Sequence, residues 1–173
     1  MTTKIKPAAT TNVAPKSAER TGRLEGKVAL VTGAAGNLGS HIVRHYVREG
    51  ARVIMTGRTK DRIDAARKAV IDDMGIADNQ VATVTLDGAD PKSVRSGMAK
   101  ALKAFGRLDI LVNNAGSAGP KQTLENVPLS AADLDANRDA GATDTETVGD
   151  AMRNILAVTW NLAREAAPHM QAG

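Results

Sequence analysis

The sequence predicts an α/β fold: a doubly wound parallel sheet, truncated after its fourth strand and the long helix that follows. Three observations support this prediction. Apolar, β-rich runs alternate with segments of helical apolar spacing, the alternation occurs four times, and the units recur roughly every thirty residues, the length of a βαβ unit. Crossovers of this length join parallel strands in a right-handed sense and place helices on both faces of the sheet.

The first part of the pattern contains two strand–helix units. Residues 27–33, KVALVTG, form an apolar run ending in glycine, which is typical of a buried parallel strand. Residues 37–49 predict a helix that Gly50 ends, because apolar side chains recur at helical spacing: Leu38, Ile42, Val43, Tyr46 and Val47. A second strand is predicted over 51–57 and a second helix over 59–74.

Two further units follow. A third strand is predicted over 80–88, and 91–105 predict a helix that opens with a first-turn proline. Residues 108–116, LDILVNNAG, predict a fourth strand, 117–143 a long loop, and 144–170 a last helix with no strand after it. One side of that helix is expected to carry Val148, Met152, Ile155, Leu156, Thr159 and Leu162.

The amino-acid composition excludes several classes of protein. Of the residues, 42% are hydrophobic, which favours a globular chain, and no run of about eighteen apolar residues could span a membrane. The N-terminus has no apolar segment of the kind that directs secretion. There is no cysteine, so disulfides and thiolate metal sites are excluded. We expect a cytoplasmic protein without a membrane partner.

The net charge of +4 is located at one end of the chain. Residues 1–23 hold five Lys or Arg and one Glu, and the remaining 150 residues hold 18 basic and 18 acidic side chains. We therefore expect a flexible basic arm over 1–23, a domain over 24–173, and no nucleic-acid partner.

TGAAGNLG, residues 32–39, joins the first strand to the first helix. Glycines here let the backbone turn tightly and approach a pyrophosphate, and the helix N-terminus attracts the anion. The literal G-x-G-x-x-G is absent, so tight packing alone remains an alternative, and the lack of G-K-[ST] argues against a P-loop hydrolase. The candidate cofactor-binding residues are Gly33, Gly36, Asn37, Leu38 and Gly39.

The second strand ends in TGRT. A carboxylate at this position would bind the ribose 2′-OH of NAD, but Thr56 and Gly57 offer none. Arg58 can instead pair with a 2′-phosphate, which favours NADP(H) as cofactor. The alternative is an ordinary exposed arginine.

The third and fourth strands also end in polar residues and glycine. Asp87 and Gly88 would lie where an adenine ring binds, although a turn-forming Asp-Gly pair is the alternative. Within NNAG, Ala115 and Gly116 leave room for a ribose, and the amide of Asn114 can tie neighbouring strands together. These features meet at the carboxyl edge of the sheet, where doubly wound folds bind ligands.

Together these motifs resemble the short-chain dehydrogenase/reductase family, which has a Rossmann-type fold. LEGKVALVTG (24–33), the glycine turn, Asp87 and NNAG stand in that family's order, and the resemblance covers nearly all of 24–173. The family's common branch has T-G-x-x-x-G-x-G, whereas here Asn37 replaces the middle glycine and Gly36 comes one position early. This spacing is similar to that of the extended, epimerase-type branch, but NNAG favours the reductase branch.

A closer resemblance rests on NNAGSAGP, NVPLS, the long loop and REAAPHM. These segments resemble the N-terminal reductase segment of bifunctional malonyl-CoA reductases. Such enzymes reduce malonyl-CoA to malonate semialdehyde in one half, and the N-terminal half reduces the semialdehyde to 3-hydroxypropionate with NADPH. The resemblance therefore implies the reduction of an aldehyde to an alcohol.

The resemblance also implies a catalytic Asn, Ser and Tyr-x-x-x-Lys. The tyrosine donates a proton to the carbonyl oxygen, the lysine lowers the tyrosine pKa, the serine holds the substrate oxygen and the asparagine orders a proton-relay water. Asn154 stands where the family's asparagine belongs, with an exposed or capping amide as the alternative. The one tyrosine is Tyr46, followed four residues later by Gly50, so Tyr-x-x-x-Lys is absent from these 173 residues.

Two hypotheses about function follow. In the first, the chain is the N-terminal fragment of an NADPH-dependent reductase and is inactive alone, and a complementary polypeptide carries the later strands with Ser, Tyr and Lys. The complete enzyme is then expected to be homo-oligomeric and to act on a small aldehyde. In the second, the chain is a non-catalytic dinucleotide-binding or scaffolding module. No metal site is expected, because His41 and His45 share a helix face without a carboxylate partner.

Overall fold

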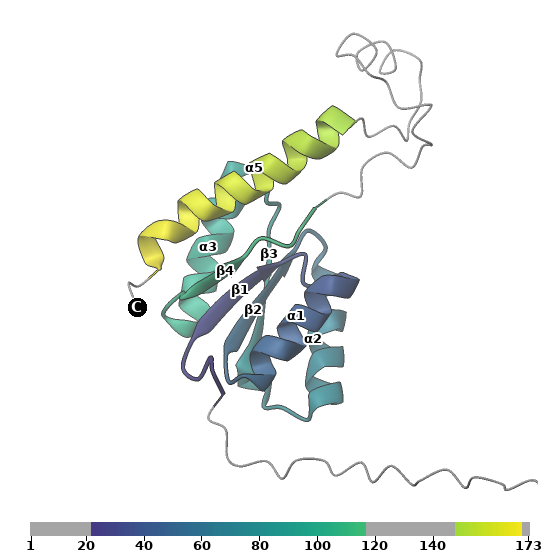
Figure 1. The fold of residues 1–173 in the computed structure, drawn as a ribbon, viewed down its shortest axis with the longest axis vertical. Helices are drawn as coiled ribbons and strands as arrows, with labels where there is room; N and C mark the ends of the chain where they lie inside the picture. Colours follow the sequence, from purple (N-terminus) through teal and green to yellow (C-terminus); the bar gives the residue numbers. More distant parts are fainter. Residues whose placement is uncertain (1–21, 117–147, 171–173) are drawn as a thin grey trace, which may run out of the picture.

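A computed structural model describes residues 22–116 and 148–170 and shows a four-stranded parallel sheet in the order β3-β2-β1-β4 (Figure 1). The parallel direction is that predicted from the sequence. The elements are β1 (Val28–Thr32), α1 (Asn37–Arg48), β2 (Arg52–Gly57), α2 (Lys60–Met74), the 3-10 turn η1 (Asp78–Gln80), β3 (Val81–Thr85), α3 (Pro91–Phe105), β4 (Ile110–Val112), α5 (Val148–Ala166) and the 3-10 turn η3 (Ala167–His169).

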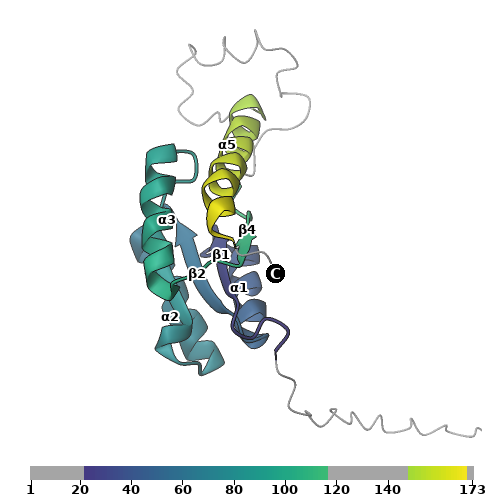
Figure 2. The same cartoon turned by 90° about the vertical axis from the view of Figure 1, so that its left-hand side faces the viewer.

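The helices divide between the two faces of the sheet according to the direction in which the strands are added. From β1 to β3 the chain moves one way across the sheet, so right-handed crossovers place α1 and α2 on the same face. It then returns past β1 to β4, and α3 lies on the opposite face together with α5 (Figures 1 and 2). The reversal lies between β1 and β4, and such a switch point opens a crevice at the carboxyl ends of the strands.

Two apolar clusters cover the faces of the sheet. All five residues of β1 are buried, as expected of a central strand that is covered on both sides. Val31 and Met55 pack with Val43 of α1 and Ile63 of α2. On the other face, Leu30 and Ile54 belong to the cluster that includes Met98 of α3 and Leu162 of α5.

The outer strands are shorter than the sequence predicted. The expected strand over 80–88 ends at Thr85, although the Leu86 N–H still donates to the Gly57 carbonyl at 3.0 Å. The expected strand over 108–116 is regular only over Ile110–Val112. After β3 the Asp87 N–H donates to Ser93 Oγ of α3, and after β4 the Asn114 N–H donates to Thr32 Oγ1, so side chains replace the ladder of backbone hydrogen bonds.

The apolar face predicted for the last helix is wrong from residue 154 onward, and the side chains of Val148 and Met152 lie outside the described part. Leu162 is buried as expected, but Leu156 is 69% exposed and Thr159 is also exposed. The buried face instead runs through Val158, Leu162 and Ala166, four residues apart, because this stripe packs in the cluster shared with α3. After the helix, Met170 forms a parallel bridge with Leu108, just before β4.

Two predicted segments lie largely outside the described residues: the basic arm over 1–23 and the loop over 117–143. At the end of the arm, the Arg23 N–H and Nε both donate to Glu49 Oε2 at 3.1 Å. None of the helices in the described ranges is both long and apolar enough to cross a membrane.

Candidate functional site

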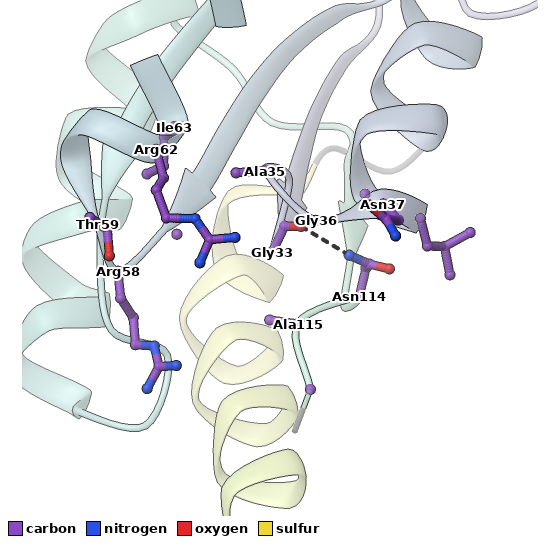
Figure 3. Close-up of a pocket in the computed structure, with 14 residues that line it drawn as sticks. Gly33, Ala35, Gly36, Asn37, Arg58, Thr59, Arg62, Ile63, Asn114 and Ala115 are labelled. Atoms are coloured by element: carbon purple, nitrogen blue, oxygen red, sulfur yellow. Dashed lines mark hydrogen bonds between the residues drawn. The ribbon is translucent and has the colours of Figure 1, made fainter. Parts of the chain in front are cut away.

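A hollow of about 490 Å³ lies at the carboxyl ends of the strands, within the size range of small-molecule sites (Figure 3). Its walls come from the β1–α1 turn, the β2–α2 junction and the residues after β4. It is lined by Gly33, Ala35, Gly36, Asn37, Leu38, Gly39, Gly57, Arg58, Thr59, Arg62, Ile63, Asn114, Ala115 and Gly116. Sequence-predicted residues from three separate segments therefore meet in one place.

Gly33 and Gly39 are required by the geometry of the β1–α1 turn. Gly33 has φ of +62°, a backbone conformation that L side chains rarely adopt. A Cβ on Gly39 would stand 2.3 Å from the Gly33 carbonyl oxygen, and one on Gly36 would stand 3.2 Å from it. Asn37 begins α1 with a negative φ. It therefore does not adopt the left-handed backbone conformation that asparagine can tolerate.

The start of α1 is suited to an anion. Gly36 is its N-cap and makes no side-chain capping bond, and the first turn contains no acidic residue. The positive end of the helix therefore faces the hollow without a carboxylate to neutralise it. Leu38, in this turn, is 67% exposed and lines the hollow instead of the core.

Thr32 and Asn114 join the carboxyl ends of β1 and β4. Thr32 Oγ1 donates to the Val112 carbonyl at 3.2 Å and accepts from the backbone N–H groups of Asn114 and Ala115, both at 2.9 Å. Asn114 Nδ2 donates in return to the Thr32 carbonyl at 2.9 Å. The prediction that the asparagine amide ties neighbouring strands is confirmed. These bonds hold Ala115 and Gly116 beside the glycine turn.

The end of β2 presents cations and no carboxylate. Arg58 and Arg62 both line the hollow, and neither has a carboxylate partner among the residues the structure describes. Thr56, the residue two before Arg58, uses its backbone carbonyl to accept from Ala34 N–H at 3.1 Å. The junction is thus bonded to the glycine turn, and the charge on this wall is positive.

A second hollow adjoins the first and shares Gly33, Gly57, Arg58, Ala115 and Gly116 with it. It contains Asp87 and Gly88 after β3, together with Asn154 and Val158 of α5. The alternative interpretation of Asp87, a turn-forming residue, also applies, because its Oδ1 accepts from Ala89 N–H at 3.0 Å.

Helix α5 is docked on the turn after β3. Asn161 Nδ2 donates to the Gly88 carbonyl at 3.1 Å. A Cβ on Gly88 would stand 2.8 Å from Val158 Cγ1, so only glycine allows this approach. The contact places Asn154, one turn before Val158, at the wall of the second hollow.

Several contributors were missed in the sequence. Arg62 is one of them: Arg58 precedes α2, so helical spacing does not relate the two side chains, and only the packing of α2 brings Arg62 to the hollow. Nothing in the sequence indicates that the Thr32 side chain joins the ends of β1 and β4. Also missed are Ala35, Thr59, Ile63, Leu86, Ala89 and Val158. Within the described ranges, no group of three or more His, Cys, Asp or Glu residues could hold a metal ion.

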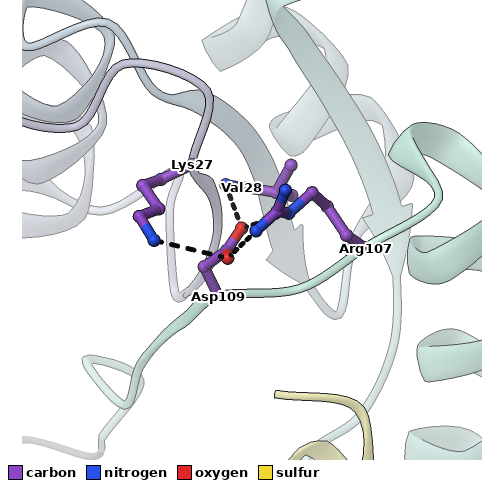
Figure 4. Close-up of polar contacts among 4 residues, drawn as sticks. All are labelled: Lys27, Val28, Arg107 and Asp109. Atoms are coloured by element: carbon purple, nitrogen blue, oxygen red, sulfur yellow. Dashed lines mark hydrogen bonds and ion pairs between the residues drawn. The ribbon is translucent and has the colours of Figure 1, made fainter. Parts of the chain in front are cut away.

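Asp109 anchors the opposite end of β4, away from the hollow (Figure 4). Its carboxylate, only 6% exposed, accepts from Val28 N–H at 2.8 Å and from Arg107 Nε at 2.9 Å. The hydrogen bond from Arg107, followed by that from the Val28 N–H and the charges of Arg107 and Lys27, lowers the pKa of Asp109 against the effect of burial. The carboxylate therefore stabilises the pairing of β1 with β4 that positions Asn114.

We expect Asp109→Asn to lower the free energy of unfolding at neutral pH by about 2 kcal/mol, because charge-assisted bonds are lost from a buried position. Since the folded-state pKa is lowered, this stabilisation is complete above the ordinary aspartate pKa and is lost as the pH falls through the lowered one. Urea unfolding of both proteins at a series of pH values checks this. A difference that stays constant into acid would contradict it, and Asp72→Asn, in an exposed pair with Lys68, is the control.

Comparison with known proteins agrees with this architecture. The family model for short chain dehydrogenases matches residues 27–172. The N-domain of a bacterial malonyl-CoA reductase, solved with NADP, is 60% identical, with a TM-score of 0.73 over 86% of this chain and 27% of that one. A 3-ketoacyl-(acyl-carrier-protein) reductase from Brucella melitensis, complexed with NADH, is 27% identical, with a TM-score of 0.63 over 84% of this chain and 50% of that one.

Among curated relatives, cis-1,2-dihydrobenzene-1,2-diol dehydrogenase from Pseudomonas putida is 42% identical over 106 residues, which are 61% of this chain and 36% of that protein. The chain thus spans half or less of the length of each of these three proteins. The two solved relatives carry different dinucleotides, so the fold by itself does not decide between NADP and NAD.

Proposed function

Because the chain belongs to the short-chain dehydrogenase family, we propose that it is the cofactor-binding part of an NADP-dependent oxidoreductase. The observation that carries this proposal is the hollow at the switch point, which combines an uncapped helix start, closely packed glycines and two arginines without a carboxylate at the end of β2. A relative that is 60% identical over most of this chain was solved with NADP, which supports the same cofactor here.

The residues present fit NADP(H) segment by segment. The Gly33–Gly39 turn and the start of α1 would hold the pyrophosphate, because a side chain on Gly39 has no room and the helix end is positive. Arg58 would hold the 2′-phosphate, Asp87 and Gly88 would border the adenine, and Asn114, Ala115 and Gly116 the second ribose. NAD has no 2′-phosphate, so it would offer no anion to the positively charged wall at the end of β2.

We further propose that the reaction is the reduction of malonate semialdehyde to 3-hydroxypropionate. The support is the identity to the malonyl-CoA reductase N-domain, together with the sequence segments that resemble it. The bound cofactor would supply a hydride to the aldehyde carbon. This chain would bind and orient that cofactor, with Asn154 of α5 bordering the second hollow. A complementary polypeptide would provide the proton donor and the groups that hold the substrate oxygen, within a homo-oligomeric enzyme.

The chain alone is expected to bind NADPH without turning over, because its 173 residues contain no Tyr-x-x-x-Lys. NADPH oxidation can be followed by absorbance after malonate semialdehyde is added to the chain alone, and to the chain co-expressed with a polypeptide that carries the later strands. Oxidation should appear only in the second sample. Steady oxidation by the chain alone would contradict the assignment of the proton donor to a second polypeptide.

The same absence of Tyr-x-x-x-Lys favours a second candidate function, a non-catalytic dinucleotide-binding module. The experiment separates the two. A co-expressed pair that binds NADPH but does not oxidise it with any short aldehyde would support the non-catalytic module.

A further inference from the structure

Three cations stand at the start of α2, and they differ in what they contact. Lys60 pairs with Asp64 one turn further along the same helix and lies outside both hollows. Arg58 lines both hollows. Arg62 lines only the first, the one that contains the glycine turn. The proposed function uses both arginines as evidence of positive charge but assigns a group of the cofactor only to Arg58.

The position of Arg62 is fixed by the residue beside it. Ile63 is 1% exposed and packs in the cluster between the sheet and α1 and α2. A Cβ on Gly57 would stand 3.3 Å from Ile63 Cγ1, so the first turn of α2 lies close against the end of β2. This contact sets the rotation of α2 about its axis. In Figure 3 the Arg62 guanidinium accordingly points into the hollow, toward the turn that carries Gly33 and Ala35.

Arg62 forms no ion pair with a described residue, although Asp61 precedes it in the first turn of α2. None of the ion pairs between described residues includes Arg62, whereas Arg44, Arg67 and Arg107 each contact an aspartate. An arginine that is solvated, unpaired and directed into a hollow is available to an anionic ligand without first breaking another bond.

The position of Arg62 at the β2–α2 junction indicates which phosphate of the cofactor it would bind. In doubly wound folds the pyrophosphate lies at the first strand–helix turn, whereas the ribose 2′ position is read by residues after the second strand. Arg58, Thr59 and Arg62 all belong to the second group. Thr59, which lines the hollow, is the N-cap of α2 and makes no side-chain capping bond, and Asp61 stands in the first turn.

We propose that Arg62 is a second specificity-determining residue that binds the 2′-phosphate of the cofactor together with Arg58. This inference rests on the proposed function, since it requires a 2′-phosphorylated dinucleotide. The two arginines approach from the loop and from the helix, so each offers donors to a different side of the phosphate, and their contributions are coupled through the shared anion.

The test is calorimetric titration of the full chain with NADP⁺ and with NAD⁺, which differ only in the 2′-phosphate and undergo no turnover when no substrate is added. Arg62→Gln should weaken NADP⁺ binding about tenfold, the lower end for a charge-assisted contact at an exposed side chain, and leave NAD⁺ binding unchanged. Arg62→Lys should recover part of the loss. Arg48→Gln removes the same charge from an exposed site at the far end of α1 and should change neither affinity.

Each alternative result has a separate meaning. If Arg62→Gln weakens both ligands equally, Arg62 contacts the pyrophosphate and the inference is overturned, while the proposed function stands. If the variant retains the full preference for NADP⁺ over NAD⁺, the inference is likewise overturned. If the unmodified chain binds both ligands equally, the preference for NADP fails first and this inference fails with it. Thermal unfolding of each variant shows whether a loss of binding reflects a loss of folding.

Discussion

Gly39→Ala is expected to lower the free energy of unfolding by about 3 kcal/mol, at the upper end of the usual cost of overpacking. The added Cβ would stand 2.3 Å from the Gly33 carbonyl oxygen and 2.9 Å from Ala34 Cα. Both contacts are with backbone, so neither can be relieved by a change of rotamer. The turn itself must move, and NADPH affinity should fall at least tenfold with it. Urea unfolding and fluorescence titration measure the two effects separately.

Gly36→Ala is the matched control in the same turn. Gly36 has φ of −82° and ψ of 168°, which any residue adopts, and its Cβ would stand 3.2 Å from the same carbonyl oxygen. We expect a loss of about 1 kcal/mol or less, because alanine is a poorer N-cap than glycine. Equal losses in the two variants would show that the close approach at Gly39 does not limit stability.

Arg58→Gln is expected to weaken NADPH about thirtyfold and NADH by less than about threefold, because only NADPH carries the 2′-phosphate that pairs with a guanidinium. Arg58 has no carboxylate partner among the described residues, so its removal leaves no buried charge behind and the fold should be unaffected. Titration of cofactor fluorescence with both dinucleotides gives the two ratios from one preparation. Equal weakening of NADPH and NADH would remove Arg58 as the discriminating residue.

Salt concentration offers an internal check on this prediction. Arg58 is exposed, so its interaction with a phosphate is screened by dissolved ions. The preference for NADPH over NADH should decrease as ionic strength rises in the unmodified chain. It should depend much less on salt in Arg58→Gln.

The predicted helix faces show the limits of periodicity. For α1, the buried residues Gly39, Val43 and Val47 repeat every four positions, and the sequence pattern included both valines. For α5, apolar residues surround much of the helix, so the pattern could not indicate which stripe is covered. Contact with the cluster shared by α3 selects Val158, Leu162 and Ala166. A helix rich in apolar residues on several sides needs its neighbours to define its buried face.

The candidate site likewise contains residues that the sequence identifies and residues that only the fold identifies. Gly33, Gly39 and Arg58 could be identified in the sequence because their positions directly after strands are local features with a known physical role. Thr32 and Arg62 could not be identified with equal certainty. Thr32 acts through Asn114, 82 residues away in the chain, and Arg62 acts through the rotation of a helix that Ile63 fixes against β2.

By itself the sequence determined the alternation of strands and helices, the glycine turn and the absence of a carboxylate directly after β2, because these depend on residue spacing and on local backbone requirements. The tertiary structure alone decided which side of α5 is buried, that Asn161 docks this helix on the turn after β3, and that a second arginine enters the hollow. Each of these depends on contacts between segments far apart in the chain, which side-chain packing settles and spacing along the sequence does not record.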